Sequence, residues 1–110
     1  MKVSELVTKT GWKNISTDES MNAEITGVYV GDLLSWVMGK GKPGEAWITV
    51  QSHINVIAVA VLIEFSCIII GDSVVVPDDV LDKAKEENLA IITTDLSPYE
   101  CARKLIEIGL

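Results

Sequence analysis

The chain has 110 residues, which is room for one domain with one hydrophobic core but not for a catalytic domain joined to a regulatory one. Hydrophobic residues make up 48% of the sequence, more than so small a domain needs for its own interior, so we expect a homodimer or larger oligomer. The net charge is −7 and Arg103 is the only arginine, so the basic stripe that neutralises the phosphates of a nucleic acid is missing. We therefore expect no nucleic-acid partner.

Apolar periodicity and turn residues predict strands that alternate with helices. A first helix over residues 4–9 ends at Gly11, and a polar link runs through 14–22, so residues 1–22 are expected as an N-terminal helix and link before a domain over 23–110. In that domain we expect strands at 24–30, 46–50, 67–70 and 89–93, and helices at 33–38, 53–63, 78–87 and 98–108. Because crossover helices cover both faces of a parallel sheet, this order predicts an α/β fold with a mostly parallel sheet of about four strands flanked by helices.

The apolar stretch over residues 54–70 is not expected to span a membrane. Asn55, Glu64 and Ser66 interrupt it, whereas a spanning helix needs about 20 apolar residues without a charge. A buried helix over 53–63 and a short buried strand over 67–70 explain the stretch better. The N-terminus has no apolar signal core, which predicts a cytoplasmic protein without a membrane partner.

The two cysteines are isolated from each other and from other metal ligands. Cys67 lies in the apolar strand and Cys101 lies on the last helix, and neither has a second cysteine or a histidine nearby in the sequence. Metal sites need clustered ligands at short spacing. We therefore expect two reduced, buried or half-buried thiols, no metal and no cofactor.

Polar residues follow each predicted strand. Because ligands bind outside the carboxyl ends of the strands in open parallel sheets, these residues are expected to meet at one edge. The candidate ligand-binding residues are Gly31, Asp32, Ser52, His53, Gly71, Asp72, Ser73, Thr94 and Asp95. Asp32, Ser52 and Ser73 can also be explained without a ligand, as helix caps and turn residues.

Two nucleotide-binding motifs can be excluded. In "GKGKPGE", residues 39–45, Gly44 is followed by Glu45 and a strand, whereas a phosphate-binding loop needs Lys and Ser or Thr at the start of a helix. No G-x-G-x-x-G follows the first strand of the domain. His53 is the sole histidine, and local sequence places no nucleophile beside it, so it is read as a cap or packing residue rather than a general base.

The C-terminal block "CIIIGDSVVVPDDVLDKAKEENLAIITTDLSPYECARKL", residues 67–105, is similar in layout to DRTGG domains and to the related N-terminal domain of HPr kinase/phosphorylase. The stretch "ITGVYVGDLLSWVMG", residues 25–39, resembles the strand end and helix that come earlier in that family. The likeness covers about residues 24–110. Asp32 matches the first residue of the family name, but Leu33 stands where the family has Arg, and Gly71, Asp72 and Ser73 stand where it has Thr-Gly-Gly.

The resemblance implies the α/β fold of HPr kinase N-terminal domains and a non-catalytic regulatory or scaffold role. It also suggests a small, nucleotide-like ligand or a redox-enzyme subunit as the partner, in addition to a second copy of the chain. No kinase motif is present. The alternatives are a small enzyme that uses Asp32 or Asp72 as base or nucleophile, and a receiver-like phosphoacceptor, for which no strand ends in the required lysine.

Overall fold

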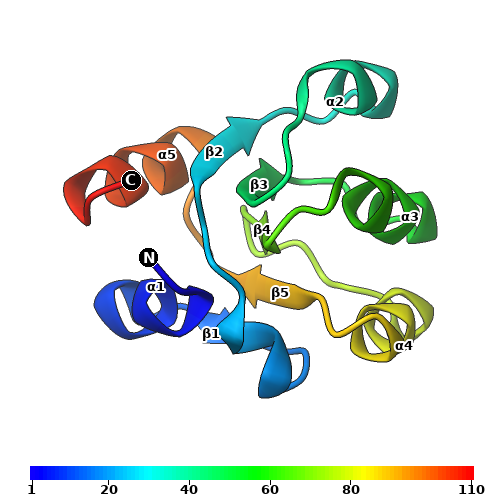
Figure 1. Cartoon of the computed structure of the whole chain (residues 1–110), viewed down its shortest axis with the longest axis horizontal. Helices are drawn as coiled ribbons and strands as arrows, with labels where there is room; N and C mark the ends of the chain where they lie inside the picture. The colour runs from blue at the N-terminus through cyan, green and yellow to red at the C-terminus, as the bar shows by residue number, and fades with distance from the viewer.

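The computed structural model describes all 110 residues and contains a five-stranded sheet with helices on both faces (Figure 1). The sheet order is β1-β5-β4-β3-β2, and the four strands from β2 to β5 are parallel. The predicted α/β class and parallel core are confirmed. The strands are β1 (Lys13–Asn14), β2 (Gly27–Val30), β3 (Glu45–Thr49), β4 (Cys67–Ile70) and β5 (Ala90–Thr93).

Three helices cover one face of the sheet and two cover the other. The helices α2 (Leu34–Lys40), α3 (Ile54–Ile63) and α4 (Asp78–Glu86) form one layer, and α1 (Val3–Thr10) and α5 (Pro98–Glu107) form the opposite one (Figure 1). Each layer has its own apolar cluster against the sheet. Strand β4 shows the division: Ile68 and Ile70 belong to the cluster under α2, α3 and α4, and Cys67 and Ile69 to the other. Its complete burial confirms the expected buried strand.

The strand count is one higher than expected because the polar link contains β1. Lys13 and Asn14 pair antiparallel with Thr93 and Ile92, and the N–H of Ile15 donates to the carbonyl of Ile91 at 2.9 Å. A 3-10 helix, η1 (Glu19–Asn22), follows. Helix α1 also packs into the molecule, since Val3 and Leu6 are fully buried in the cluster that contains α5.

Local signals in the sequence account for the carboxyl end of α1 and the amino end of α5. The Gly11 cap of α1 has a φ of +75°, in the left-handed region that glycine adopts without strain. Helix α5 begins with the predicted capping box, in which Ser97 accepts from the N–H of Glu100 and Glu100 accepts from the N–H of Ser97. No helix is long and apolar enough to cross a membrane.

Candidate functional site

The carboxyl ends of β2, β3, β4 and β5 lie side by side at one edge of the sheet. The strand registers pair Val30 with Ile48, Thr49 with Ile70, and Ile70 with Thr93. The polar residues that follow these strands therefore meet at the same edge, as the sequence predicts. Their roles at that edge differ.

Gly31 and Asp32 fasten the end of β2 to β3. The indole N–H of the fully buried Trp47 donates to the Gly31 carbonyl at 2.8 Å. One carboxylate oxygen of Asp32, Oδ1, accepts from Thr49 Oγ1 at 2.7 Å and from the Val50 N–H at 2.9 Å. Gln51 Nε2 donates to the Asp32 carbonyl at 3.2 Å. These contacts give Asp32 a structural role.

Asp32 and Asp72 do not form a carboxylate pair. They follow β2 and β4, and β3 lies between these strands. Since neighbouring strands are about 4.8 Å apart, the two strand ends are separated by on the order of 10 Å. Two carboxyl groups that share a proton must be in direct contact, so this spacing does not support a shared-proton pair.

His53 caps the amino end of α3. Its Nδ1 accepts from the N–H of Asn55 at 3.1 Å, which is the cap role expected from the sequence. Ser52, directly before it, is half-buried, and the Ser52 side chain makes no hydrogen bond.

The loop after β4 is held in an uncommon backbone conformation. Both Asp72 and Ser73 have a φ of +56°, in the left-handed region that β-carbon-bearing residues seldom occupy. The N–H of Asp72 donates to the Leu96 carbonyl at 2.8 Å and that of Ser73 to the Thr94 carbonyl at 3.1 Å. A Cβ on Gly71 would lie 2.8 Å from the Leu96 carbonyl oxygen, so only glycine fits there. The Asp72 and Ser73 side chains remain exposed and without hydrogen bonds.

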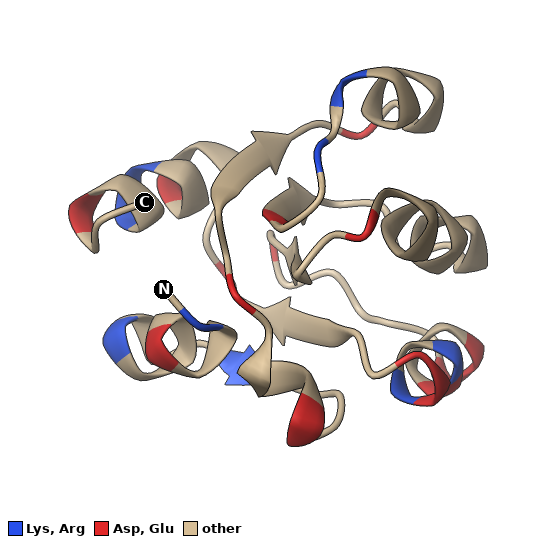
Figure 2. Cartoon of the chain, viewed as in Figure 1, with Lys and Arg blue, Asp and Glu red and all other residues tan.

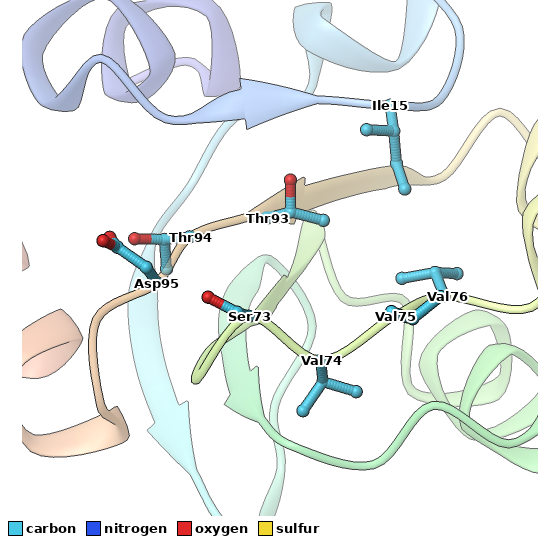
Figure 3. Close-up of a pocket in the computed structure, with 8 residues that line it drawn as sticks. All are labelled: Ile15, Ser73, Val74, Val75, Val76, Thr93, Thr94 and Asp95. Atoms are coloured by element: carbon cyan, nitrogen blue, oxygen red, sulfur yellow. The ribbon is translucent and has the colours of Figure 1, made fainter.

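An open pocket of about 390 Å³ lies between this loop and the end of β5 (Figure 3). Ser73, Thr94 and Asp95 lie toward one end of it, and Ile15, Val75 and Val76 toward the other (Figure 3). Val74 and Thr93 complete the lining. The size falls in the range of about 300–1,000 Å³ that small-molecule sites have, and an apolar wall with a few polar groups is their usual composition.

The pocket includes residues that the sequence reasoning missed. Ile15 falls in the stretch that the sequence predicts as a polar link, and residues 74–76 fall between the predicted strand and helix, but both line this pocket beside β5. The valines do carry a sequence signal, because three consecutive β-branched residues before Pro77 favour extended backbone rather than a helix. Among the predicted candidates, Ser73, Thr94 and Asp95 line this pocket, whereas Gly31, Asp32, Ser52 and His53 do not.

The only charged residue in the lining of the pocket is Asp95. None of the residues that line it is Lys or Arg. Burial, followed by the negative charges of Asp72, Glu100 and Asp95, raises the pKa of the Cys101 thiol to about 11. Burial alone raises the pKa of Cys67 to about 12. Both thiols are therefore protonated near neutral pH and are poor nucleophiles. The structure has no group of three or more His, Cys, Asp or Glu side chains placed to hold a metal ion.

Comparison with solved structures shows the fold. The crystal structure of the CBS and DRTGG domains of the regulatory region of Clostridium perfringens pyrophosphatase, complexed with the activator diadenosine tetraphosphate, superposes with a TM-score of 0.79 at 14% sequence identity. The match covers 96% of this chain and 46% of that one, so the chain spans about half the length of its structural neighbour. No protein-family model and no curated protein sequence matches the chain.

This similarity supports a DRTGG-like α/β fold for the chain. At 14% sequence identity the similarity extends to the fold, but it does not show that the two proteins bind the same ligand, since one fold can serve many functions. The neighbour belongs to the regulatory region of its own protein.

Proposed function

We propose that the chain is a non-catalytic regulatory module that binds a small, nucleotide-like ligand in the pocket beside β5. The observation that carries this proposal is the shared fold with a regulatory region that was crystallised with a nucleotide activator. The pocket supports this location for the ligand, because it adjoins the carboxyl end of a parallel strand inside the sheet.

The chemistry of the pocket favours the nucleoside part of a nucleotide. The flat, largely apolar face of a base suits the end formed by Ile15, Val75 and Val76. Hydroxyl groups of a sugar can donate to the Asp95 carboxylate and exchange hydrogen bonds with Ser73 at the other end. Because the lining has carboxylate but no Lys or Arg, phosphates should point away from it into solvent.

The proposal is tested by calorimetric titration with adenosine, AMP and diadenosine tetraphosphate. We expect binding of at least one of them, and a loss of about tenfold or more for Asp95→Asn, since a hydrogen bond to a charged group contributes about 1.5–3 kcal/mol. The matched control is Asp82→Asn, which changes an exposed aspartate on α4 away from the pocket. The absence of binding to all three compounds, or equal losses in the two variants, would contradict the proposal.

The enzymatic alternative has less support. Asp32 Oδ1 is already engaged by Thr49 and Val50, and Asp72 has no neighbouring acid, base or nucleophile bonded to it. A carboxylate that acts as base or nucleophile needs a second group that orients or activates it, and Asp72 has no such group in hydrogen-bond contact. Turnover of a phosphate ester by purified protein that disappears in Asp72→Asn would revive this alternative.

Three further parts of the proposal come from composition and family resemblance. We propose that the module is a homodimer because its apolar content exceeds the need of one small core. We also propose that residues 23–110 form the DRTGG-like unit, related to the HPr kinase N-terminal domain, and that a redox-enzyme subunit is its protein partner. Copurification with a tagged copy of the chain, followed by identification of the captured subunit, tests the last of these.

A further inference from the structure

Residues 13–17 form the outer border of the sheet beside β5, and we call them the β1 segment. Its strand β1 pairs with the carboxyl end of β5, and the Ile15 N–H donates to the Ile91 carbonyl at 2.9 Å. At the other end of the segment, Thr17 Oγ1 donates to Asn88 Oδ1 at 2.9 Å, just before β5 begins. The β1 segment therefore runs antiparallel along the length of β5 (Figure 1).

One wall of the pocket beside β5 belongs to the β1 segment. Ile15 reaches the apolar end of the pocket from this segment, and Val75 and Val76 reach it from the loop between β4 and α4 (Figure 3). Strand β5 has β1 on one side and β4 on the other. A ligand that fills the apolar end therefore contacts both walls only while the β1 segment is docked on β5.

The β1 segment is attached to the sheet by few contacts. Charge does not hold it, because Lys13 is its only charged residue, β5 has none, and no ion pair involves the segment (Figure 2). Strand β1 is two residues long, and its outer edge has no partner strand. Helix α1 has its own anchors in the fully buried Val3 and Leu6. The segment can therefore leave β5 while α1 and the parallel strands stay in place.

A buried hydroxyl group opposes docking of the β1 segment. Ser16 Oγ is buried without a hydrogen-bond partner, whereas water would hydrate it on a released segment. The N–H of Ser16 donates to Asn14 Oδ1 at 3.1 Å, so the loss is confined to the hydroxyl. Burial of a polar group without a partner is unfavourable. The docked state is thus held by the bonds to β5 and Asn88, and the Ser16 hydroxyl weakens it.

We propose that the β1 segment opens independently of the rest of the sheet, and that its docking and ligand binding in the pocket reinforce each other. This inference rests on the proposed ligand site. A ligand that contacts Ile15 binds the docked state in preference to the open one, so binding shifts the population toward the docked state. The coupling is reciprocal, and release of the segment therefore weakens ligand binding. The docking of residues 13–17 is then the change by which the module reports its ligand.

Amide hydrogen exchange of the free protein, measured by NMR, tests the independent opening. The Ile15 amide should exchange at least about tenfold faster than the amide of the fully buried Ile69 in β4, because it needs only local opening. Asn88→Gly should speed exchange at Ile15 by about two- to tenfold, since it removes the acceptor of Thr17. Glycine retains the left-handed backbone of Asn88, which has a φ of +50°. Ser16→Ala should slow the exchange, because the unpaired hydroxyl is gone.

Two controls locate the effect. Thr26→Val removes another exposed hydrogen bond, which Thr26 Oγ1 donates to a loop carbonyl at 3.3 Å beside β2, on the opposite edge of the sheet. It should leave exchange at Ile15 unchanged. The Gly31 N–H donates to the Ile48 carbonyl at 3.2 Å at that same edge, and its exchange should not respond to either variant of the β1 segment's attachment.

Exchange in the presence of ligand tests the coupling. The titration with adenosine, AMP and diadenosine tetraphosphate identifies a compound that binds, and exchange is then measured at a free concentration about ten times its dissociation constant. The Ile15 amide should slow by about tenfold, because the segment must open from the ligand-free state. The Gly31 amide should not change, because the pocket remains intact when the end of β2 opens.

The outcomes separate the coupling from the ligand site. If none of the three compounds binds, the proposed function fails and the coupling fails with it. If a compound binds but leaves the Ile15 amide unchanged, or slows the Gly31 amide equally, only the coupling is overturned. It is also overturned if the Ile15 amide of the free protein exchanges as slowly as that of Ile69, or if Asn88→Gly or Ser16→Ala leaves exchange at Ile15 unchanged.

Discussion

The Thr49 hydroxyl, on a fully buried residue at the end of β3, donates to the Asp32 carboxylate at 2.7 Å, beyond the end of β2. The bond joins two residues that are 17 positions apart in the chain. Strand β2 is at the edge of the sheet and pairs with β3 alone. The bond therefore ties the end of β2 to its only neighbouring strand.

Removing the Asp32 carboxylate should destabilise the fold. Asp32→Ala leaves the hydroxyl of the fully buried Thr49 without its acceptor, and it also removes the acceptor of the more exposed Val50 N–H. We expect a loss of about 1.5–3 kcal/mol in the free energy of unfolding, measured by urea denaturation. Asp32→Asn keeps an acceptor oxygen and should lose less. A loss no larger than that of Asp82→Ala, at an exposed site on α4, would contradict the structural role of Asp32.

Two glycine substitutions should have opposite effects. Gly71→Ala brings a Cβ within 2.8 Å of the Leu96 carbonyl oxygen and must displace backbone, so we expect destabilisation by at least about 1–3 kcal/mol. Gly39→Ala adds a methyl group where no atom lies within 4 Å, in the helix α2. It should stabilise by about 0.5–1 kcal/mol, because alanine favours helix and loses less entropy on folding. Melting temperatures that shift in the same direction would be inconsistent with this geometry.

Relief of backbone strain should be measurable at Ser73. Its φ of +56° is costly for serine and free for glycine. Ser73→Gly should therefore leave stability unchanged or raise it by up to about 1 kcal/mol, although glycine substitutions normally destabilise through the unfolded chain. Ser35→Gly is the control, because Ser35 is exposed and helical in α2, and this substitution should destabilise the protein. The two unfolding free energies can be compared directly.

The cysteines should make stability fall in alkaline solution. In the folded chain burial raises the pKa of Cys67 to about 12, and burial with nearby carboxylates raises the pKa of Cys101 to about 11, from an ordinary value of 9.0. Unfolding therefore releases protons above about pH 9, and stability should decline toward pH 11 by up to about 1.4 kcal/mol per pH unit for each thiol. Below about pH 8 the thiols should have no effect.

The same effect can be isolated with a variant. Cys101→Ala lowers stability at every pH by removing buried volume, but it should flatten the decline between about pH 9 and about pH 11. Urea denaturation of the two proteins at about pH 8 and about pH 10 measures the difference in slope. Parallel pH profiles would mean that Cys101 does not keep a raised pKa in the folded state.

Much of the fold follows from signals that lie within a few residues of each other. The apolar run at 67–70 and the Ser97, Pro98 and Glu100 start of α5 predict their elements almost to the residue. Strand β1 was missed because two residues carry no periodicity. Its pairing with β5 depends on contacts made across nearly 80 positions of sequence, between Lys13 and Thr93.

The candidate site was only partly predictable for the same reason. The rule for parallel sheets identifies the correct edge, and it therefore names Ser73, Thr94 and Asp95. It cannot separate residues that face a pocket from residues that hold strands together, because Asp32 looks the same in sequence whether or not Thr49 lies beside it. It also cannot supply Ile15, which comes from outside the parallel unit.

The short strand β1 also limits how these sheets can associate. An uncovered β5 would offer a β-branched edge to any other chain, but Lys13 and Asn14 occupy it and Ile15 bonds to Ile91. The new edge is only two residues long and carries a lysine, which are two of the features that discourage strand addition. Only β2 remains as a longer open edge. Strand addition on the β5 side of the sheet is therefore blocked by a segment from the amino-terminal part of the same chain.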